Sequence, residues 1–126
     1  MKCEIYAKCD VNPTEDIDKV IKALSNLFDY DEIIIEENFV SILGGSESIN
    51  NFHKELVQRK IRGAARKMML KGMGTNKIQF SLSKQAAFVG VPNFVETVYS
   101  TLGEIEVEIR TSNVEKFIDW IAPALE

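Results

Sequence analysis

The chain has 126 residues, of which 45% are hydrophobic and 27% charged, and its formal net charge is −4 at pH 7. This length predicts a single domain (1–126) that can bury about two-thirds of the surface of its unfolded form. No apolar run approaches the roughly 20 residues of a membrane span, and the N-terminus lacks the apolar core of a signal peptide. We therefore expect a cytoplasmic protein with no membrane partner.

The net charge conceals a strong asymmetry along the chain. Residues 48–95 contain nine Lys or Arg and a single acid, Glu55, a local balance of +8. The other 78 residues contain six Lys or Arg and eighteen acids, a balance of −12. A cationic segment within an acidic protein is informative about binding partners rather than about the fold.

The first predicted element is a strand at residues 2–9, where apolar and polar side chains alternate. A helix follows, with Asn12 as its N-cap, Pro13 at the first helical position and Glu15 three residues after the cap. Apolar residues at spacings of three and four extend this helix to about Asp29.

A hairpin of two short strands, 33–35 and 39–43, leads into a second helix that begins near Ile49. The continuation of this helix, His53–Lys71, holds most of the positive charge of the chain. The apolar positions shift around the helix axis along this segment, so we expect a kink or break near residues 57–63. The expected buried stripe consists of Val57, Ile61, Ala64, Ala65 and Met68.

The C-terminal half begins with an alternating strand at 77–83, followed by one helical turn, 83–87, that Ser83 can cap. Pro92 excludes a regular central strand in the next segment. A strand at 104–110 and a helix at 112–123 complete the chain.

These elements predict an α+β fold, a two-layer sandwich with a mostly antiparallel sheet of about five strands and helices on one face. The opposite face of the sheet is polar and is expected to meet water or a partner. The side chains expected on that face are Lys2, Glu4, Lys8, Glu104, Glu106 and Glu108.

The sequence offers little for catalysis, and we predict a protein that is not an enzyme and needs no cofactor. His53 is the only histidine and has no acidic or nucleophilic neighbour in a recognised arrangement. Cys3 and Cys9 are about 20 Å apart along a strand, too far to form a disulfide, and no metal site is expected. Three carboxylates at 104, 106 and 108 could hold a hard cation, but their spacing is also that of an exposed strand face.

The cationic helix is the main candidate for binding. Arg59, Arg62 and Arg66 lie along one edge of its polar side, and Lys60, Lys67 and Lys71 lie along the other. These side chains are either a solvated rim over the core or a surface that binds a polyanion. Lys84 and Gln85 follow a strand that leaves this helix through a glycine-rich connection, and both can donate to phosphate oxygens.

Several segments resemble an archaeal family of small proteins that are described as RNA-binding. They are VNPTEDIDKVIKAL, GAARKMMLKG, IQFSLSKQAAFVG, LGEIEVEI and FIDWIAP, which together span most of the chain. The resemblance implies a fold similar to that of the ribosomal protein that holds 5S ribosomal RNA. By position, Arg66, Lys84 and Gln85 match polar residues of the family motif and Arg59 matches a basic position. The chain departs from the family pattern at Ser83, where Asn is common, and lacks an acid near Gly63.

We therefore predict a non-catalytic RNA-binding protein that contacts phosphates through the basic helix (59–71) and the Lys84–Gln85 turn. The predicted contact residues are Arg59, Arg62, Arg66, Lys67, Lys71, Lys84 and Gln85. One alternative is a protein-interaction module or a homodimer that uses the same cationic face. Another is a nucleotide or phosphate binder that uses Arg66, Lys84 and Gln85.

Overall fold

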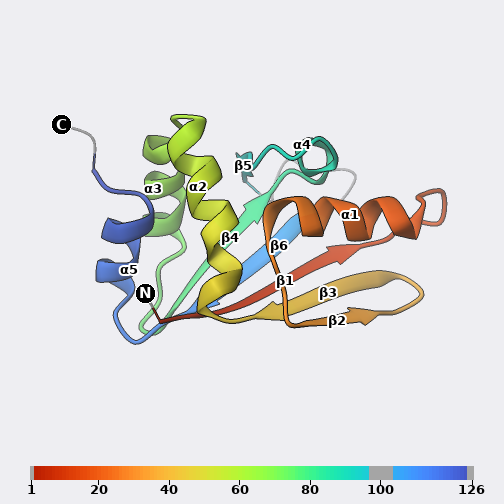
Figure 1. Cartoon of the computed structure of the whole chain (residues 1–126), viewed down its shortest axis with the longest axis horizontal. Coiled ribbons are helices and arrows are strands. Elements are labelled where there is room, and N and C mark those ends of the chain that lie inside the picture. Colours follow the sequence, from red (N-terminus) through yellow and green to blue (C-terminus); the bar gives the residue numbers. More distant parts are fainter. Residues whose placement is uncertain (1, 97–103, 125–126) are drawn as a thin grey trace.

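The computed structural model describes residues 2–96 and 104–124, in which six strands form one sheet in the order β2-β3-β1-β6-β4-β5 (Figure 1). Every neighbouring pair of strands is antiparallel. The strands are β1 (Glu4–Asp10), β2 (Glu32–Ile35), β3 (Phe39–Gly44), β4 (Lys77–Leu82), β5 (Phe94–Val95) and β6 (Ile105–Arg110).

The predicted α+β class is confirmed, but the expected number of five strands is wrong. The sixth strand is β5, which pairs only with Ser81 and Leu82 of β4. A strand of two residues is too short to produce a recognisable alternation in the sequence. Its position at the edge of the sheet agrees with the exclusion of a central strand beside Pro92.

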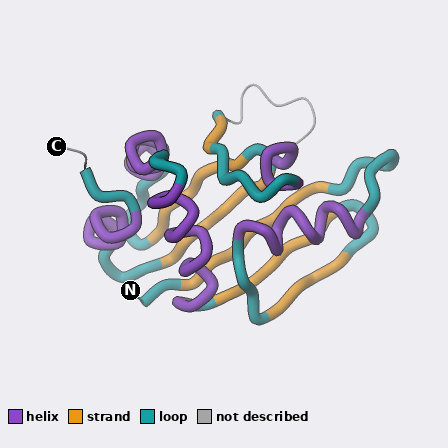
Figure 2. Tube along the Cα trace, turned by 45° about the horizontal axis from the view of Figure 1, so that its top comes forward, coloured by secondary structure: helices purple, strands orange, loops and turns teal. Residues whose placement is uncertain are grey.

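The helices of the described residues lie on one face of the sheet (Figure 2). Figure 1 shows α2, α3 and α5 over one half of that face and α1 and α4 over the other half. The helices are α1 (Ile17–Leu27), the short 3-10 helix η1 (Ser46–Ile49), α2 (Asn50–Gln58), α3 (Arg62–Lys71), α4 (Lys84–Phe88) and α5 (Val114–Ile121). None of the helices in the described ranges is long and apolar enough to cross a membrane.

The basic segment forms two helices, because the chain breaks between Gln58 and Arg62 as the shifted apolar pattern predicted. Lys60 has a φ of +57°, a left-handed conformation that ends α2. The break resets the helical phase, and the expected buried stripe is therefore wrong in part. Val57 is 47% exposed, and Ala65 and Met69 are the buried residues of α3.

The helix starts differ slightly from those expected. α1 begins one turn later than predicted, with Asp16 as its N-cap accepting from the N–H of Asp18. Asn12 and Glu15 instead form the turn before α1, where the N–H of Asn12 donates to Oε1 of Glu15 at 2.9 Å. The short helix α4 is capped as predicted, since Oγ of Ser83 accepts from the N–H of Ala86 at 3.1 Å.

A close contact with β4 fixes the position of the C-terminal end of α3 on the sheet. The N–H of Gln79 in β4 donates to the carbonyl oxygen of Gly72 at 3.0 Å. A Cβ at Gly72 would overlap the carbonyl oxygen of Gln79, so only glycine allows this approach. The contact, together with the burial of Ala65 and Met69, leaves the opposite side of α3 facing solvent.

Candidate nucleic-acid interface

The two helices α2 and α3, with the turn that joins them, form the cationic part of the molecule. We define the basic surface as Arg59, Lys60, Arg62, Lys67 and Lys71. Within the described ranges, Lys60, Arg62 and Lys67 have no ion pair, whereas Arg59 and Lys71 each have one. The three cations of this surface that have no ion pair with a described residue lie at the start and on the exposed side of α3.

The start of α3 is an uncapped helix N-terminus surrounded by these cations. Ile61 occupies the N-cap position and provides no side-chain hydrogen bond, and the first turn contains no acid. The first N–H groups of a helix have no intrahelical partner and carry a partial positive charge. Lys60 and Arg62 add full positive charges at the end of the helix where cations are least favourable. An anion bound there would accept hydrogen bonds from the free N–H groups and would offset the positive charges of Lys60 and Arg62.

The ion pairs of Arg59 and Lys71 lie at the surface. Nε of Arg59 is 2.7 Å from Oε2 of Glu55, one helical turn before it. Nζ of Lys71 is 3.0 Å from Oε1 of Glu96, and both side chains are about half exposed, at 62% and 46%. Exposed pairs of this kind contribute about 0.2–1 kcal/mol. Both cations can therefore exchange their carboxylate for a phosphate at small cost.

Arg66 joins two helices. Its Nη1 donates to Oδ1 of Asp119 at 2.8 Å and to the carbonyl oxygen of Ala122 at 3.2 Å. Its side chain is only 26% exposed. The edge formed by Arg59, Arg62 and Arg66 is thus partly occupied in holding α3 against α5.

Lys84 is a buried structural lysine. Its side chain is 4% exposed, and Nζ donates to Oε1 of Glu15 at 2.8 Å and to the carbonyl oxygen of Asp10 at 2.7 Å. Its backbone N–H donates to Oε2 of Glu104 at 3.3 Å. These contacts fasten α4 to the end of β1 and to the turn before α1, so the ammonium group is not presented to a ligand.

Gln85 is exposed, but it lies on α4, which packs against α1. By contrast, α3 packs against α2, α5, β4 and β5. The structure therefore does not bring Gln85 and Lys84 into the basic surface. The same placement separates Arg66 from Lys84. The phosphate or nucleotide site suggested for Arg66, Lys84 and Gln85 is therefore not formed by these residues.

The pair of Lys84 and Glu15 makes stability sensitive to acid. Partial burial by itself raises the pKa of Glu15, but the hydrogen bonds from Lys84 and Asn12 outweigh it and lower this pKa. A carboxylate whose pKa is lower in the folded state stabilises the fold above its unfolded pKa of about 4.3. That stabilisation disappears as the pH falls through the folded pKa.

We therefore expect Glu15→Gln to lower the free energy of unfolding at pH 7 and to have a smaller effect at pH 2–3, because the stabilisation from the carboxylate decreases as the pH falls toward and through its lowered folded pKa. Urea unfolding followed by circular dichroism at both pH values measures the difference. Glu37→Gln, in the exposed β2–β3 turn, is the control and should change little at either pH. An effect of Glu15→Gln that is equally large at both pH values would contradict the prediction.

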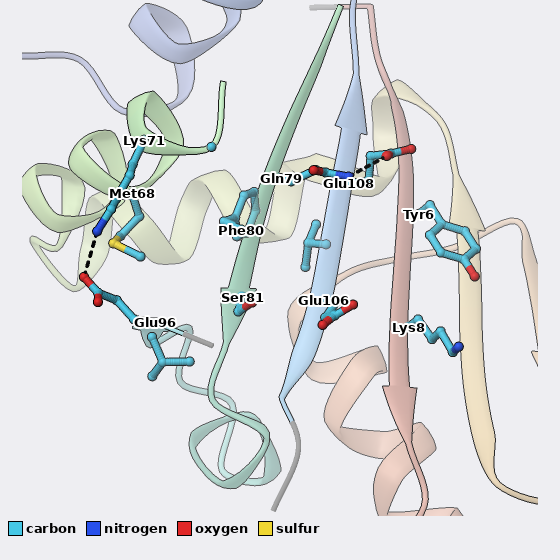
Figure 3. Close-up of a pocket in the computed structure, with 13 residues that line it drawn as sticks. Tyr6, Lys8, Met68, Lys71, Gln79, Phe80, Ser81, Glu96, Glu106 and Glu108 are labelled. Carbon is cyan, nitrogen blue, oxygen red and sulfur yellow. Dashed lines mark hydrogen bonds and ion pairs between the residues drawn. The ribbon is translucent and has the colours of Figure 1, made fainter. Parts of the chain in front are cut away.

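The open face of the sheet is the other polar surface, and it is rich in carboxylates. A groove of about 540 Å³ crosses it, lined on the sheet by Tyr6, Lys8, Gln79, Glu106 and Glu108 (Figure 3). At its other side the groove is lined by Met68 and Lys71 of α3. Oε1 of Glu108 accepts from Nε2 of Gln79, and Oε2 of Glu108 accepts from Nε of Arg110. These hydrogen bonds lower the pKa of Glu108, so it is ionised at neutral pH. A phosphate backbone would meet anionic groups here.

The other potentially reactive side chains, His53 and Cys9, are partly or fully buried and are held in their neutral forms. The ring of His53 lies 4.3 Å from that of Trp120, and burial lowers the pKa of His53 so that the neutral imidazole predominates. Burial also raises the pKa of Cys9 to about 12, which keeps this thiol protonated and unreactive. Across the described part of the chain, no group of three or more His, Cys, Asp or Glu could hold a metal ion.

Comparison with known proteins supports the resemblance noted in the sequence. A family model described as RNA binding matches residues 4–111. The chain is 36% identical to a UPF0201 protein of Saccharolobus solfataricus, covering 95% of this chain and 87% of the relative. It is 37% identical to a UPF0201 protein of Methanothermobacter thermautotrophicus, covering 95% of this chain and 91% of the relative.

Solved structures agree with these sequence matches. The crystal structure of a UPF0201 protein from Methanococcus jannaschii superimposes with a TM-score of 0.81 at 35% identity, covering 98% of this chain and 95% of that one. The crystal structure of another UPF0201 protein gives a TM-score of 0.85 at 35% identity, covering 96% and 94%. The expected likeness to the 5S-rRNA-binding ribosomal protein stays a prediction. The chain belongs to the archaeal UPF0201 family and to the family that the RNA-binding model describes.

Proposed function

We propose that this protein binds RNA through the basic surface of α2 and α3. The observation that carries the proposal is the start of α3, where Lys60 and Arg62 flank an uncapped helix N-terminus. Within the described residues nothing neutralises either cation. Free helical N–H groups beside unpaired cations are a common binding arrangement for phosphate groups.

In the proposed complex, one phosphate accepts hydrogen bonds from the N–H groups of the first turn of α3 and from the guanidinium of Arg62. Arg62 suits this role because a guanidinium grips two phosphate oxygens at once. Lys67 contacts the next phosphate along the exposed side of the helix, and Arg59 and Lys71 join by releasing Glu55 and Glu96. Arg66 positions α3 against α5, and Lys84 supports the fold.

The open face of the sheet is not expected to take part. Some RNA-binding sheets stack bases on exposed aromatic rings. Tyr6 is 38% exposed on the open face, but Glu106 and Glu108 lie beside it on β6. These carboxylates repel the phosphates that would follow a stacked base. Binding through α3 alone depends mainly on the RNA backbone, so we expect weak sequence preference and strong dependence on salt.

The test replaces Arg62 and Lys67 with Gln and measures binding to a labelled single-stranded RNA by fluorescence anisotropy over a range of salt concentrations. Each phosphate contact contributes about 0.7 to the slope of log affinity against log salt for single strands. We therefore expect the double variant to lose about 1.4 from the slope and to bind at least about tenfold more weakly at low salt.

The matched control replaces Lys19 and Lys22 with Gln. Both residues lie exposed on α1, and their replacement changes the net charge by the same amount. This control should keep nearly all of the affinity and slope of the wild type. Equal losses in the two double variants, or an absence of RNA binding by the wild type at low salt, would overturn the proposal.

A second candidate is a homodimer in which the basic surface of one copy meets the acidic open face of another. The favouring observation is that one chain carries both a cationic helix and a groove lined by Glu106 and Glu108. Multi-angle light scattering at low and high salt distinguishes the two. A dimer that dissociates as salt rises, with no RNA bound, would favour this candidate over RNA binding.

A further inference from the structure

The outer edge of the sheet at β2 is a strand edge without a described neighbour, since β2 pairs only with β3. The N–H of Glu36 donates to the carbonyl of Phe39, which sets the alternation of hydrogen bonds along this hairpin. In an antiparallel pair, every second residue directs its N–H and C=O away from its neighbour. The register of β2 and β3 makes Ile33 and Ile35 those outward-directed residues.

The isoleucine side chains of β2 leave the edge open to another strand. Ile34 is 40% exposed on the open face of the sheet, and Ile35 is 52% exposed on the opposite face. Natural edge strands are usually protected by a proline, a lysine or an inward-pointing charge. The segment 33–35 is Ile-Ile-Ile and has none of these. The edge therefore offers both unpaired backbone groups and exposed apolar surface.

The surroundings of β2 are strongly acidic. Residues 29–37 contain five acids, and no Lys or Arg occurs anywhere in residues 23–53. Beside the start of the strand, a groove of about 670 Å³ opens on the open face of the sheet, with Asp31, Glu32 and Glu4 along its wall. Among the described residues, the one cation that lines this groove is Arg110, and its Nε is paired with Oε2 of Glu108 at 2.8 Å. The carboxylates of Asp31, Glu32 and Glu4 make no ion pair with a described residue.

This charge argues against a second copy of the same chain as the occupant of the edge. If two β2 strands paired about a two-fold axis, Glu32 and the acids of one copy's turn would face the equivalent acids of the other. Like charges opposite each other in a sheet are destabilising. A strand that carries Lys or Arg would instead place its cations against these acids and into the groove.

We propose that β2 is a docking edge for an extended polypeptide of another protein, one whose apolar residues alternate with Lys or Arg. Its backbone would pair with the N–H and C=O groups of Ile33 and Ile35, in the manner of strand addition. Its apolar side chains would cover Ile34 and Ile35, and a cation would enter the groove beside Asp31 and Glu32. This proposal does not depend on RNA binding.

The probe is a fluorescein-labelled peptide, Lys-Val-Lys-Val-Thr-Val-Arg-Lys, whose binding is followed by fluorescence anisotropy at low salt. We expect saturable binding, with amide NMR shifts concentrated in residues 31–36. Ile35→Pro removes an outward N–H without touching the bonds to β3, because proline is tolerated where the N–H faces away from the sheet. This variant should bind the peptide up to about tenfold more weakly, the loss expected from one backbone hydrogen bond.

Ile35→Thr is the matched control, since it shortens the same side chain but keeps the N–H, and it should bind more tightly than Ile35→Pro. If Ile35→Pro unfolds, Ile34→Lys provides a second test, because an added cation on the edge should repel the peptide. A peptide with Glu in place of each Lys and Arg should not bind. Equal binding by Ile35→Pro and Ile35→Thr, binding of the acidic peptide, or a wild-type dimer that dissociates in Ile35→Pro would overturn the proposal.

Discussion

Lys84→Met is expected to destabilise the fold by about 3 kcal/mol. Removing one member of a buried ion pair typically costs 3–5 kcal/mol, because the partner is left charged and uncompensated. The lower end applies here, since the side chain of Glu15 is 21% exposed and keeps some contact with water. The carbonyl oxygen of Asp10 also loses its donor. Urea unfolding at pH 7 measures the change.

Gln85→Met is the control for this prediction, because it introduces the same side chain, Met, at the exposed neighbouring position. It should change the free energy of unfolding by less than about 0.5 kcal/mol. The double variant Lys84→Met with Glu15→Gln should recover part of the loss, since the partly buried carboxylate that Lys84→Met leaves unpaired is then absent. A stable Lys84→Met protein that binds RNA poorly would mean that Lys84 belongs to the interface after all.

Gly72→Ala is expected to cost at least about 3 kcal/mol, the upper part of the range for overpacking. The added Cβ would overlap the carbonyl oxygen of Gln79, which is backbone in the middle of the fold and cannot turn aside like a side chain. Relief requires α3 to move away from β4 and to lose the hydrogen bond between Gly72 and Gln79. Thermal unfolding followed by circular dichroism should detect a large decrease in melting temperature.

Gly45→Ala is a suitable comparison, because a Cβ there meets nothing closer than Oδ2 of Asp31 at 3.8 Å. Its effect should stay within about 1 kcal/mol. Similar unfolding curves for Gly72→Ala and the wild type would contradict the close approach of α3 to the sheet, and with it the orientation of the basic surface.

The local patterns of the sequence predicted most of the fold. Strict alternation at β1 and β6 and the three-four pattern of α1 depend on which face of an element is buried, and that information is local. The break between α2 and α3 was also visible as a shift of the apolar stripe. The sequence did not show which side chains of α3 would be buried after the break. The left-handed conformation of Lys60 changes the rotation of α3 about its axis relative to α2, and Met69 rather than Met68 lies in the core.

The candidate site was less predictable, since it depends on contacts between distant residues. Lys84 and Glu15 are 69 positions apart, and Arg66 and Asp119 are 53 apart. A cation in the sequence gives no sign of whether a carboxylate from another element will bury or pair it. Lys60 entered the site for the same reason, because only the turn geometry places it at the start of α3.

The central claim is that the start and exposed side of α3 contact RNA, and chemical-shift mapping tests it most directly. Titration of the isotope-labelled protein with a short single-stranded RNA at low salt should shift the amide signals of residues 60–67 first and most. The amides of β1 and β6 on the open face should remain unchanged. Shifts that concentrate on the open face, or an RNA titration that moves no signal of α3, would contradict the account.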